Sequence, residues 1–255
     1  MRRLWIIALV GIALLVAGCG GDDNKDEPPP DPLALLNESA AKIRAAATFR
    51  LEVNLAGADY LFPAIIDDQE VDVGFRRAIG QYVAPASLQA RVSIKMGILT
   101  LDVDIFAHGD DQWYKYLAVD WRNEDFTEDF NPQKLIAEDS GFQRALTAID
   151  ELEYLGIEGL EDGTDVYHLH GVADGADVTD LLVGLVEFKT IVPVDIYVDT
   201  ETRYPIRIVL TQPENITEDQ PEATTWTVDV YGINDAPELS PPADANIAEL
   251  TEEPS

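Results

Sequence analysis

Two histidines and a pair of aspartates are the side chains in this sequence whose spacing could support chemistry. His168 and His170 lie two residues apart, so on a strand they would share one face and could bind a metal ion together with an acid. No third ligand has a convincing spacing, so we expect a solvated outer face and no metal. Asp102 and Asp104 have the same spacing, but a glycosidase pair needs a cleft that nothing in the sequence indicates.

The motifs of the common enzyme classes are absent from the sequence. The chain contains no GxGxxG, no P-loop, no GxSxG and no HExxH pattern. Four aromatic residues between Trp113 and Trp121 could stack on sugars, but such residues more often anchor a sheet. We therefore expect a protein without catalytic activity and without a cofactor.

The only cysteine of the chain lies at the end of an N-terminal apolar segment. Two arginines precede an uncharged run from Leu4 to Ala17, which suits a secretory signal and is shorter than the ~20 residues of a membrane-spanning helix. The run ends in Leu15-Val16-Ala17-Gly18-Cys19, which resembles the lipobox of bacterial lipoproteins. We expect residues 1–18 to be a signal peptide and Cys19 to carry acyl chains, palmitate among them. The alternative is a short anchor helix with an incidental cysteine.

The charge balance excludes some partners. The chain has 48 acidic and 17 basic residues, a formal net charge of -31. Such a surface repels the phosphates of nucleic acid and disfavours an anionic membrane surface. We therefore expect attachment to the membrane through the acylated Cys19, on the extracytoplasmic face, and no nucleic-acid partner.

Composition also divides the chain into segments. Residues 19–32 are rich in glycine, proline and acids and predict a linker, and residues 237–255 predict a disordered acidic tail. The folded domain is then expected over residues 33–236. With 46% hydrophobic residues, the chain has enough apolar material for a core.

The hydrophobic pattern predicts few helices and many strands. Asp31 and Pro32 suit the N-cap and first turn of an amphipathic helix that ends near Ala47. Further helices are expected after Asn131, with an apolar stripe from Phe142 to Ile149, and over residues 178–186. Alternation of apolar and polar residues predicts ten strands, at residues 49–55, 71–82, 88–94, 99–105, 113–119, 154–160, 165–172, 191–198, 205–210 and 225–231.

These elements predict an α+β fold built on a long curved antiparallel sheet. Three amphipathic helices are too few to fill the concave side of about ten curled strands at native packing density. An apolar cavity between sheet and helices would follow. A conventional, fully packed core is an equally open alternative at this point.

Several segments, in this order, resemble a known family. From about residue 35 to residue 237 the chain is similar to the mycobacterial LppX/LprA/LprF/LprG lipoproteins, and more distantly to the LolA/LolB lipoprotein carriers. The segments that carry the resemblance, besides the lipobox, are Ala46–Leu51, Gly109–Lys115, Asp129–Pro132, Leu135–Ile136, Gly141–Phe142, Gly156–Gly171, Pro193–Asp199 and Pro205–Arg207.

The resemblance implies a fold and a function. The fold would be a U-shaped half-barrel with helices on its concave face and a hydrophobic cavity for acyl chains. The protein would bind a lipid or glycolipid for carriage across the cell envelope, with a membrane transporter as a possible partner. The strongly acidic composition favours a neutral or glycosylated headgroup. The alternative is a structural or adhesive envelope lipoprotein with a filled core.

The residues expected to line such a cavity are apolar side chains on the inward faces of strands and helices. For each of them the alternative is plain core packing, and an error of one position would invert a strand's list. They are Leu51, Val53, Val73, Phe75, Leu88, Val92, Leu101 and Val103 on strands, and Leu146, Ile149, Leu181, Leu182 and Leu185 on helices.

Overall fold

The computed structural model describes most of the predicted domain and part of its flanks. The described residues are 29–66, 69–117, 119–125 and 130–245. The predicted signal peptide, Cys19 and most of the linker lie outside them, as does the end of the tail. Within the described ranges, no helix has the length and apolar character needed to cross a membrane.

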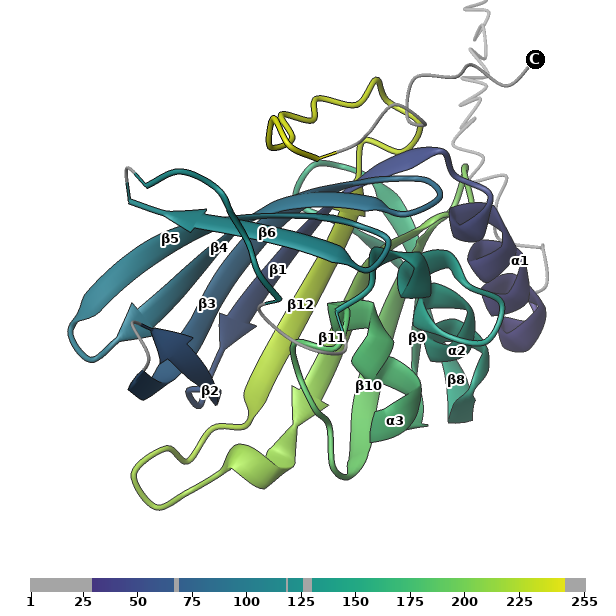
Figure 1. The fold of residues 1–255 in the computed structure, drawn as a ribbon. Helices are drawn as coiled ribbons and strands as arrows, with labels where there is room; N and C mark the ends of the chain where they lie inside the picture. The colour runs from purple at the N-terminus through teal and green to yellow at the C-terminus, as the bar shows by residue number, and fades with distance from the viewer. Residues whose placement is uncertain (1–28, 67–68, 118, 126–129, 246–255) are drawn as a thin grey trace, which may run out of the picture.

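One antiparallel sheet of 12 strands forms the body of the protein (Figure 1). The strands are β1 Thr48–Ala56, β2 Leu61–Ile66, β3 Gln69–Val83, β4 Ser87–Met96, β5 Leu99–His108, β6 Asp111–Tyr116, β7 Arg122–Asn123, β8 Ile149–Gly159, β9 Asp165–Asp174, β10 Ile191–Asp199, β11 Pro205–Gln212 and β12 Thr224–Tyr231. Their order is β7-β6-β5-β4-β3-β1-β12-β11-β10-β9-β8, with β2 paired to β3. The sheet is therefore an open, curled half-barrel, as expected.

The first and last strands are neighbours at the centre of the sheet. Leu51 of β1 pairs with Val230 of β12, and Val53 pairs with Val228. Every other pair along the main order joins strands that are consecutive or nearly consecutive in the chain. The β1–β12 pair thus joins two meanders, residues 48–123 and 149–231, into one continuous surface with one apolar face.

Helices cover part of the concave face. They are α1 Pro32–Arg44, α2 Gly141–Thr147 and α3 Gly175–Val178, and the 3-10 helices η1 Pro132–Ile136, η2 Thr179–Leu182 and η3 Pro213–Asn215. The N-cap of α1 is Asp31, whose carboxylate accepts a hydrogen bond from the Ala34 amide at 2.8 Å, as the sequence predicted. Figure 1 shows α1, α2 and α3 on the side of the sheet formed by β8 to β11.

The structure corrects the expected helices. The helix predicted from the apolar stripe Phe142 to Ile149 is shorter in the structure. It is α2, which ends at Thr147, and Ile149 is the first residue of β8. The helix expected over residues 178–186 is only α3 followed by η2, and the chain turns where Val183 takes a left-handed φ of 47°. Apolar residues at helical spacing do not distinguish a long helix from two short turns that bury the same side chains.

The structure also has two strands more than the ten expected. The strand β2 contains Pro63, which cannot donate to a ladder, and it pairs only with β3. The strand β7 has only two residues, Arg122 and Asn123, too few to show alternation. Neither strand has a run of alternating apolar and polar residues, so the hydrophobic pattern does not predict them.

Part of the predicted acidic tail packs against the sheet. Residues 237–245 lie on the outer face of the sheet, where the Ser240 amide donates to the side chain of Gln89 at 2.6 Å. Leu239 packs against a cluster formed by Phe106, Trp113 and Ala245. Two large apolar side chains on the outer face of β5 and β6 therefore need a cover, and the acidic tail supplies it.

Candidate functional site

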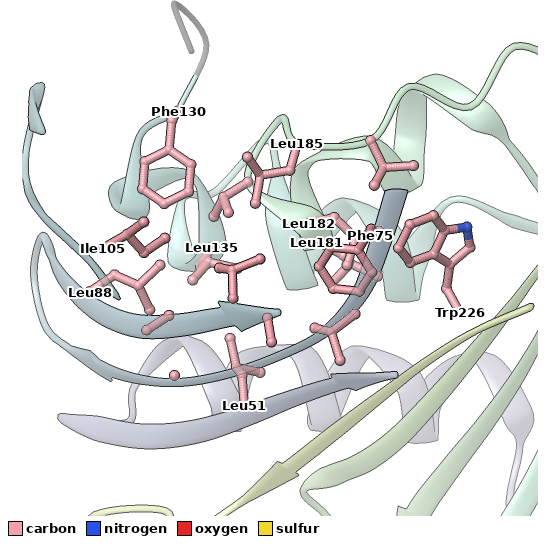
Figure 2. A pocket seen from close by; sticks show the side chains of 17 residues that line it. Leu51, Phe75, Leu88, Ile105, Phe130, Leu135, Leu181, Leu182, Leu185 and Trp226 are labelled. Carbon is pink, nitrogen blue, oxygen red and sulfur yellow. The ribbon is translucent and has the colours of Figure 1, made fainter. Parts of the chain in front are cut away.

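An apolar cavity lies between the concave face of the sheet and the short helices (Figure 2). About 540 Å³ of its space is free of protein atoms, including the part open to solvent, and only a small part admits a water-sized sphere. No charged side chain lines it. The lining residues are Leu51, Val53, Phe75, Ala78, Gly80, Leu88, Ala90, Val92, Ile105, Phe130, Leu135, Leu181, Leu182, Val183, Leu185, Val186 and Trp226.

Alternate residues of β1, β3, β4 and β5 form the floor of the cavity. Leu88, Ala90 and Val92 share the concave face of β4 because successive side chains of a strand point to opposite faces. In β3 the register shifts between Phe75 and Arg77, so the concave face continues at Ala78 rather than at residue 77. The bulge keeps an apolar residue over the cavity and turns Arg77 outward.

The segment around η1 forms one part of the roof, with Phe130 and Leu135 over the cavity. The side chain of Asn131 caps η1 by accepting from the Gln133 amide at 2.8 Å. Gly141, with a φ of 48°, starts α2 so close to η1 that an added Cβ would lie 2.2 Å from the Lys134 carbonyl oxygen. The position therefore requires glycine, and it fixes η1 against α2.

The segment around η2 forms the rest of the roof. Leu181, Leu182, Val183, Leu185 and Val186 all line the cavity. Two ion pairs hold this segment to its neighbours, Arg144 of α2 to Asp177, and Lys134 of η1 to Asp180 at 3.7 Å. The roof is thus made of single helical turns joined by surface contacts, unlike the continuous ladders of the floor.

Aromatic side chains close one end of the cavity around Trp226. Its ring lies 5.1 Å from Phe75, 5.3 Å from Tyr60 and 6.5 Å from Phe188, measured between ring centroids. Its indole N–H donates to the side-chain oxygen of Gln212 at 3.1 Å. The one polar atom of the ring is therefore satisfied by the protein.

Eight of the thirteen residues expected to line a cavity do line this one. They are Leu51, Val53, Phe75, Leu88, Val92, Leu181, Leu182 and Leu185. The strand residues among them lie on the concave faces of β1, β3 and β4.

The other five do not line the cavity, which corrects the expectation. Val73 and Leu146 are fully buried in the packed core elsewhere. Leu101 and Val103 are half-buried on the concave face of β5, beyond the cavity, and Ile149 is half-buried at the start of β8. Alternation gives the face of a side chain, whereas its position relative to the roof depends on tertiary packing.

Nine lining residues were not among those expected. Ala90 and Ile105 lie on the same strands and faces as residues that were expected, so the alternation already contained them. Ala78 and Gly80 continue the pattern of β3. Phe130, Leu135, Val183, Val186 and Trp226 had no distinguishing signal, because any apolar residue of a loop or strand can serve as core.

The two histidines lie on the outer face of the sheet. The Nδ1 of His168 lies 2.7 Å from Glu158 Oε1, and its Nε2 lies 3.0 Å from Asp195 Oδ1. His170 Nδ1 lies 2.9 Å from the same Asp195 oxygen. Burial lowers the pKa of His168, but the hydrogen bonds to Asp195 and Glu158 raise it more, so its pKa lies above the usual value.

The histidines and the aspartate pair contact side chains of neighbouring strands on the outer face of the sheet. No cluster of three or more His, Cys, Asp or Glu residues there has the arrangement of a metal site. Asp104 pairs with Arg91 at 2.7 Å and with Lys115 at 3.7 Å, and Asp102 accepts from the Ser93 hydroxyl at 2.5 Å. These carboxylates are outer-face partners of neighbouring strands.

Known structures share this architecture. The chain matches LppX of Mycobacterium tuberculosis with a TM-score of 0.55 and 16% identity, over 84% of this chain and 100% of that one. It matches LprF of Mycobacterium bovis with a TM-score of 0.57 and 13% identity, over 84% of this chain and 98% of that one. At these identities the likeness establishes the fold alone. Comparison with curated proteins gives no significant match.

The sequence itself carries the family relationship. A model of the LppX_LprAFG lipoproteins matches residues 31–235, which span the whole sheet and all the helices described above. The half-barrel, its short roof helices and its apolar cavity all lie within this match. The chain therefore belongs to the LppX_LprAFG lipoprotein family.

Proposed function

We propose that this lipoprotein holds the acyl chains of a lipid or glycolipid in its cavity and carries them across the cell envelope. The observation that carries the proposal is a hollow on the concave face of the sheet, lined by apolar residues and with no charged side chain in its lining. No catalytic step is part of the proposal.

Hydrophobic transfer supplies the binding energy. Each buried methylene contributes about 0.8 kcal/mol, so a dozen contribute on the order of 10 kcal/mol before the costs of association. Because much of the cavity is narrow, the walls must move apart to admit a chain. The roof is the part that can move, since it consists of single helical turns with surface ion pairs.

The headgroup would remain outside the apolar lining. The lining offers no charge to an anionic headgroup, and the chain's net charge of -31 repels one. A neutral or glycosylated headgroup fits these properties. With Cys19 acylated, the domain would work on the extracytoplasmic face of the cell membrane, and a membrane transporter is a suitable accessory partner.

Native purification followed by mass spectrometry tests the proposal. The full chain is purified in a mild detergent and extracted with organic solvent. The molar ratio of extracted lipid to protein is then measured. Because the protein has one candidate site, we expect about one acyl-chain lipid per protein, besides the chains attached to Cys19. A protein that carries no lipid, and takes up none from vesicles, would contradict the proposal.

A structural or adhesive envelope lipoprotein is the second candidate. The narrowness of the cavity favours it, because a space that hardly admits a water-sized sphere approaches a filled core. Lipid exchange with vesicles distinguishes the two candidate functions. A carrier exchanges its lipid with vesicles, whereas a structural lipoprotein neither releases nor takes up lipid.

A further inference from the structure

The turn between β4 and β5 exposes apolar side chains to solvent. Ile98 is 99% exposed, and the adjacent Leu99 is 64% exposed. Hairpin turns usually carry polar residues and glycine, and here only Gly97 follows that rule. Figure 1 shows this turn at the lower left of the sheet, on the side away from α1, α2 and α3. We call residues 96–99 the β4–β5 tip.

A ladder of apolar pairs leads from the tip to the cavity. On the concave face, Met96 pairs with Leu99, then Ile94 with Leu101, Val92 with Val103, and Ala90 with Ile105. All eight side chains are apolar, and alternate residues of both strands point to the outer face. Val92, Ala90 and Ile105, at the inner end, line the cavity. The ladder and the cavity therefore form one continuous apolar surface.

Burial along β5 changes in steps from the cavity to the tip. Ile105 is 6% exposed, Val103 and Leu101 are half-buried, and Leu99 is 64% exposed. Leu117, which directly follows Tyr116 at the end of β6, is also exposed, at 78%. On the paired strand β4, Val92 and Ile94 are buried at 9% and 8% exposed, so the exposure is greatest at the tip and extends inward only partly, along β5.

We propose that the β4–β5 tip inserts into the apolar layer of a lipid bilayer, and that the ladder conducts an acyl chain between that layer and the cavity. This inference rests on the proposed function. A bilayer is the occupant that fits, because the ladder leads into a cavity lined only by apolar groups. A protein partner would be expected to need polar groups around the apolar centre of its interface.

Charge does not drive this contact. Residues 96–101 contain no charged side chain. The nearest cation on β4, Lys95, lies 3.6 Å from Asp59, which also pairs with Arg76 at 2.8 Å. The chain as a whole is strongly acidic. The tip should therefore bind zwitterionic vesicles better than anionic ones, with little dependence on salt.

Site-specific fluorescence on the full chain tests the insertion. The variant Ile98→Cys, labelled with an environment-sensitive dye, is reconstituted into dioleoylphosphatidylcholine vesicles. Ile157→Cys is the matched control, because Ile157 is 57% exposed on β8, the opposite edge of the sheet from β7. Dye uptake by the unsubstituted chain gives the background from Cys19.

The expected result is a blue shift at position 98 and quenching by lipids brominated on their acyl chains, with neither change at position 157. Water-like emission at position 98 in vesicles would overturn the inference. Insertion of both positions to equal depth would also overturn it, since the tip would then have no special role. A change at position 98 that needs a second protein, rather than vesicles, would assign the tip to a protein partner instead.

A transfer assay connects the tip to lipid movement. The variants Ile98→Asp and Leu99→Asp should slow exchange of a fluorescent acyl lipid with vesicles by roughly tenfold, and Ile157→Asp should leave it unchanged. The lipid that co-purifies with the protein should not change, because neither side chain lines the cavity. If the wild-type chain holds no lipid, the proposed function fails. If it holds lipid and the tip variants exchange normally, only the docking inference fails.

Discussion

The indole N–H of Trp226 donates to Oε1 of Gln212 at 3.1 Å, with both side chains almost fully buried. The bond joins neighbouring positions of β12 and β11 at the closed end of the cavity. Gln212 also donates to the Glu187 carbonyl at 3.3 Å, which ties the roof segment to the sheet. One glutamine thus satisfies the only polar atom of the Trp226 ring and anchors the chain above it.

Removal of this acceptor should destabilise the fold. For Gln212→Met we expect the free energy of unfolding to fall by about 1–3 kcal/mol, because a buried N–H loses its partner. Chemical denaturation measures the change. In the double variant Gln212→Met/Trp226→Phe the loss should be smaller than the sum of the two single losses. Additive losses would show that the bond contributes nothing.

An added ring in the floor should block lipid uptake. Ala90→Phe adds a phenyl group to the floor of the cavity, at the residue that pairs with Gly80. Bound lipid, measured by mass spectrometry, should fall at least about fivefold. Ile79→Phe is the control, since Ile79 is 40% exposed and does not line the cavity. Equal lipid content in the two variants would count against the cavity as the binding site.

A shortened roof residue should change which lipids bind. Leu182→Ala removes a side chain that lines the cavity, and we expect longer or bulkier acyl chains in the extracted lipid. Leu146→Ala is the matched control, because Leu146 is fully buried on α2 but does not line the cavity. Both variants should lose about 2–5 kcal/mol of stability. The proposal fails if the lipid profile shifts equally in both.

Stability should depend on the protonation of His168. Burial lowers its pKa, but hydrogen bonds to Asp195 and Glu158 outweigh this and place the pKa above the usual histidine value of 6.5. A raised pKa means that the folded protein binds the proton more tightly than the unfolded chain. The stabilisation is therefore complete below pH 6.5 and is lost as the pH rises through the folded pKa.

Denaturation of the wild type and of His168→Asn, measured between about pH 5.5 and pH 9, tests this dependence. The wild type should lose stability relative to the variant as the pH rises. His170→Asn is the control on the same strand face; its imidazole contacts only Asp195 among the hydrogen bonds described, and its side chain is 41% exposed. A wild-type curve parallel to that of His168→Asn would refute the assignment.

Substitution of the single cysteine should release the protein from the membrane. The thiol of Cys19 is the only one in the chain, so Cys19→Ser removes any thioether-linked lipid. Each buried methylene of an acyl chain contributes about 0.8 kcal/mol to anchoring, so its loss should move the protein to the aqueous phase of a detergent partition. Intact-mass measurement of the wild type should show the added acyl mass. An unmodified Cys19 would contradict the lipobox prediction.

The sequence predicted the strands well because their signal is local. Period-two alternation follows from strand geometry, so segments such as β1, β4 and β5 were found with the correct face inward. The N-cap of α1 at Asp31 is likewise a property of adjacent residues. The family resemblance, read from the order of such segments, gave the half-barrel, and the family match confirms the membership.

Tertiary structure decided which apolar side chains face empty space. Leu101 and Ile105 both occupy the concave face of β5, yet only Ile105 lies under the roof and lines the cavity. The difference arises from where η1 and η2 lie over the sheet, and no residue of β5 encodes that position. Trp226 reaches the cavity because β12 pairs with β1, a contact between the two ends of the domain.

Local pattern and long-range packing therefore settled different questions about this protein. The sequence by itself determined the faces of the strands and the net negative charge, and it predicts the lipobox at Cys19, because each depends on neighbouring residues or on composition. The tertiary structure alone decided the extent of the roof, the cavity beneath it and the strong exposure of Ile98 and Leu99 at the β4–β5 tip. These depend on contacts between residues far apart in the chain, which alternation along one strand does not report.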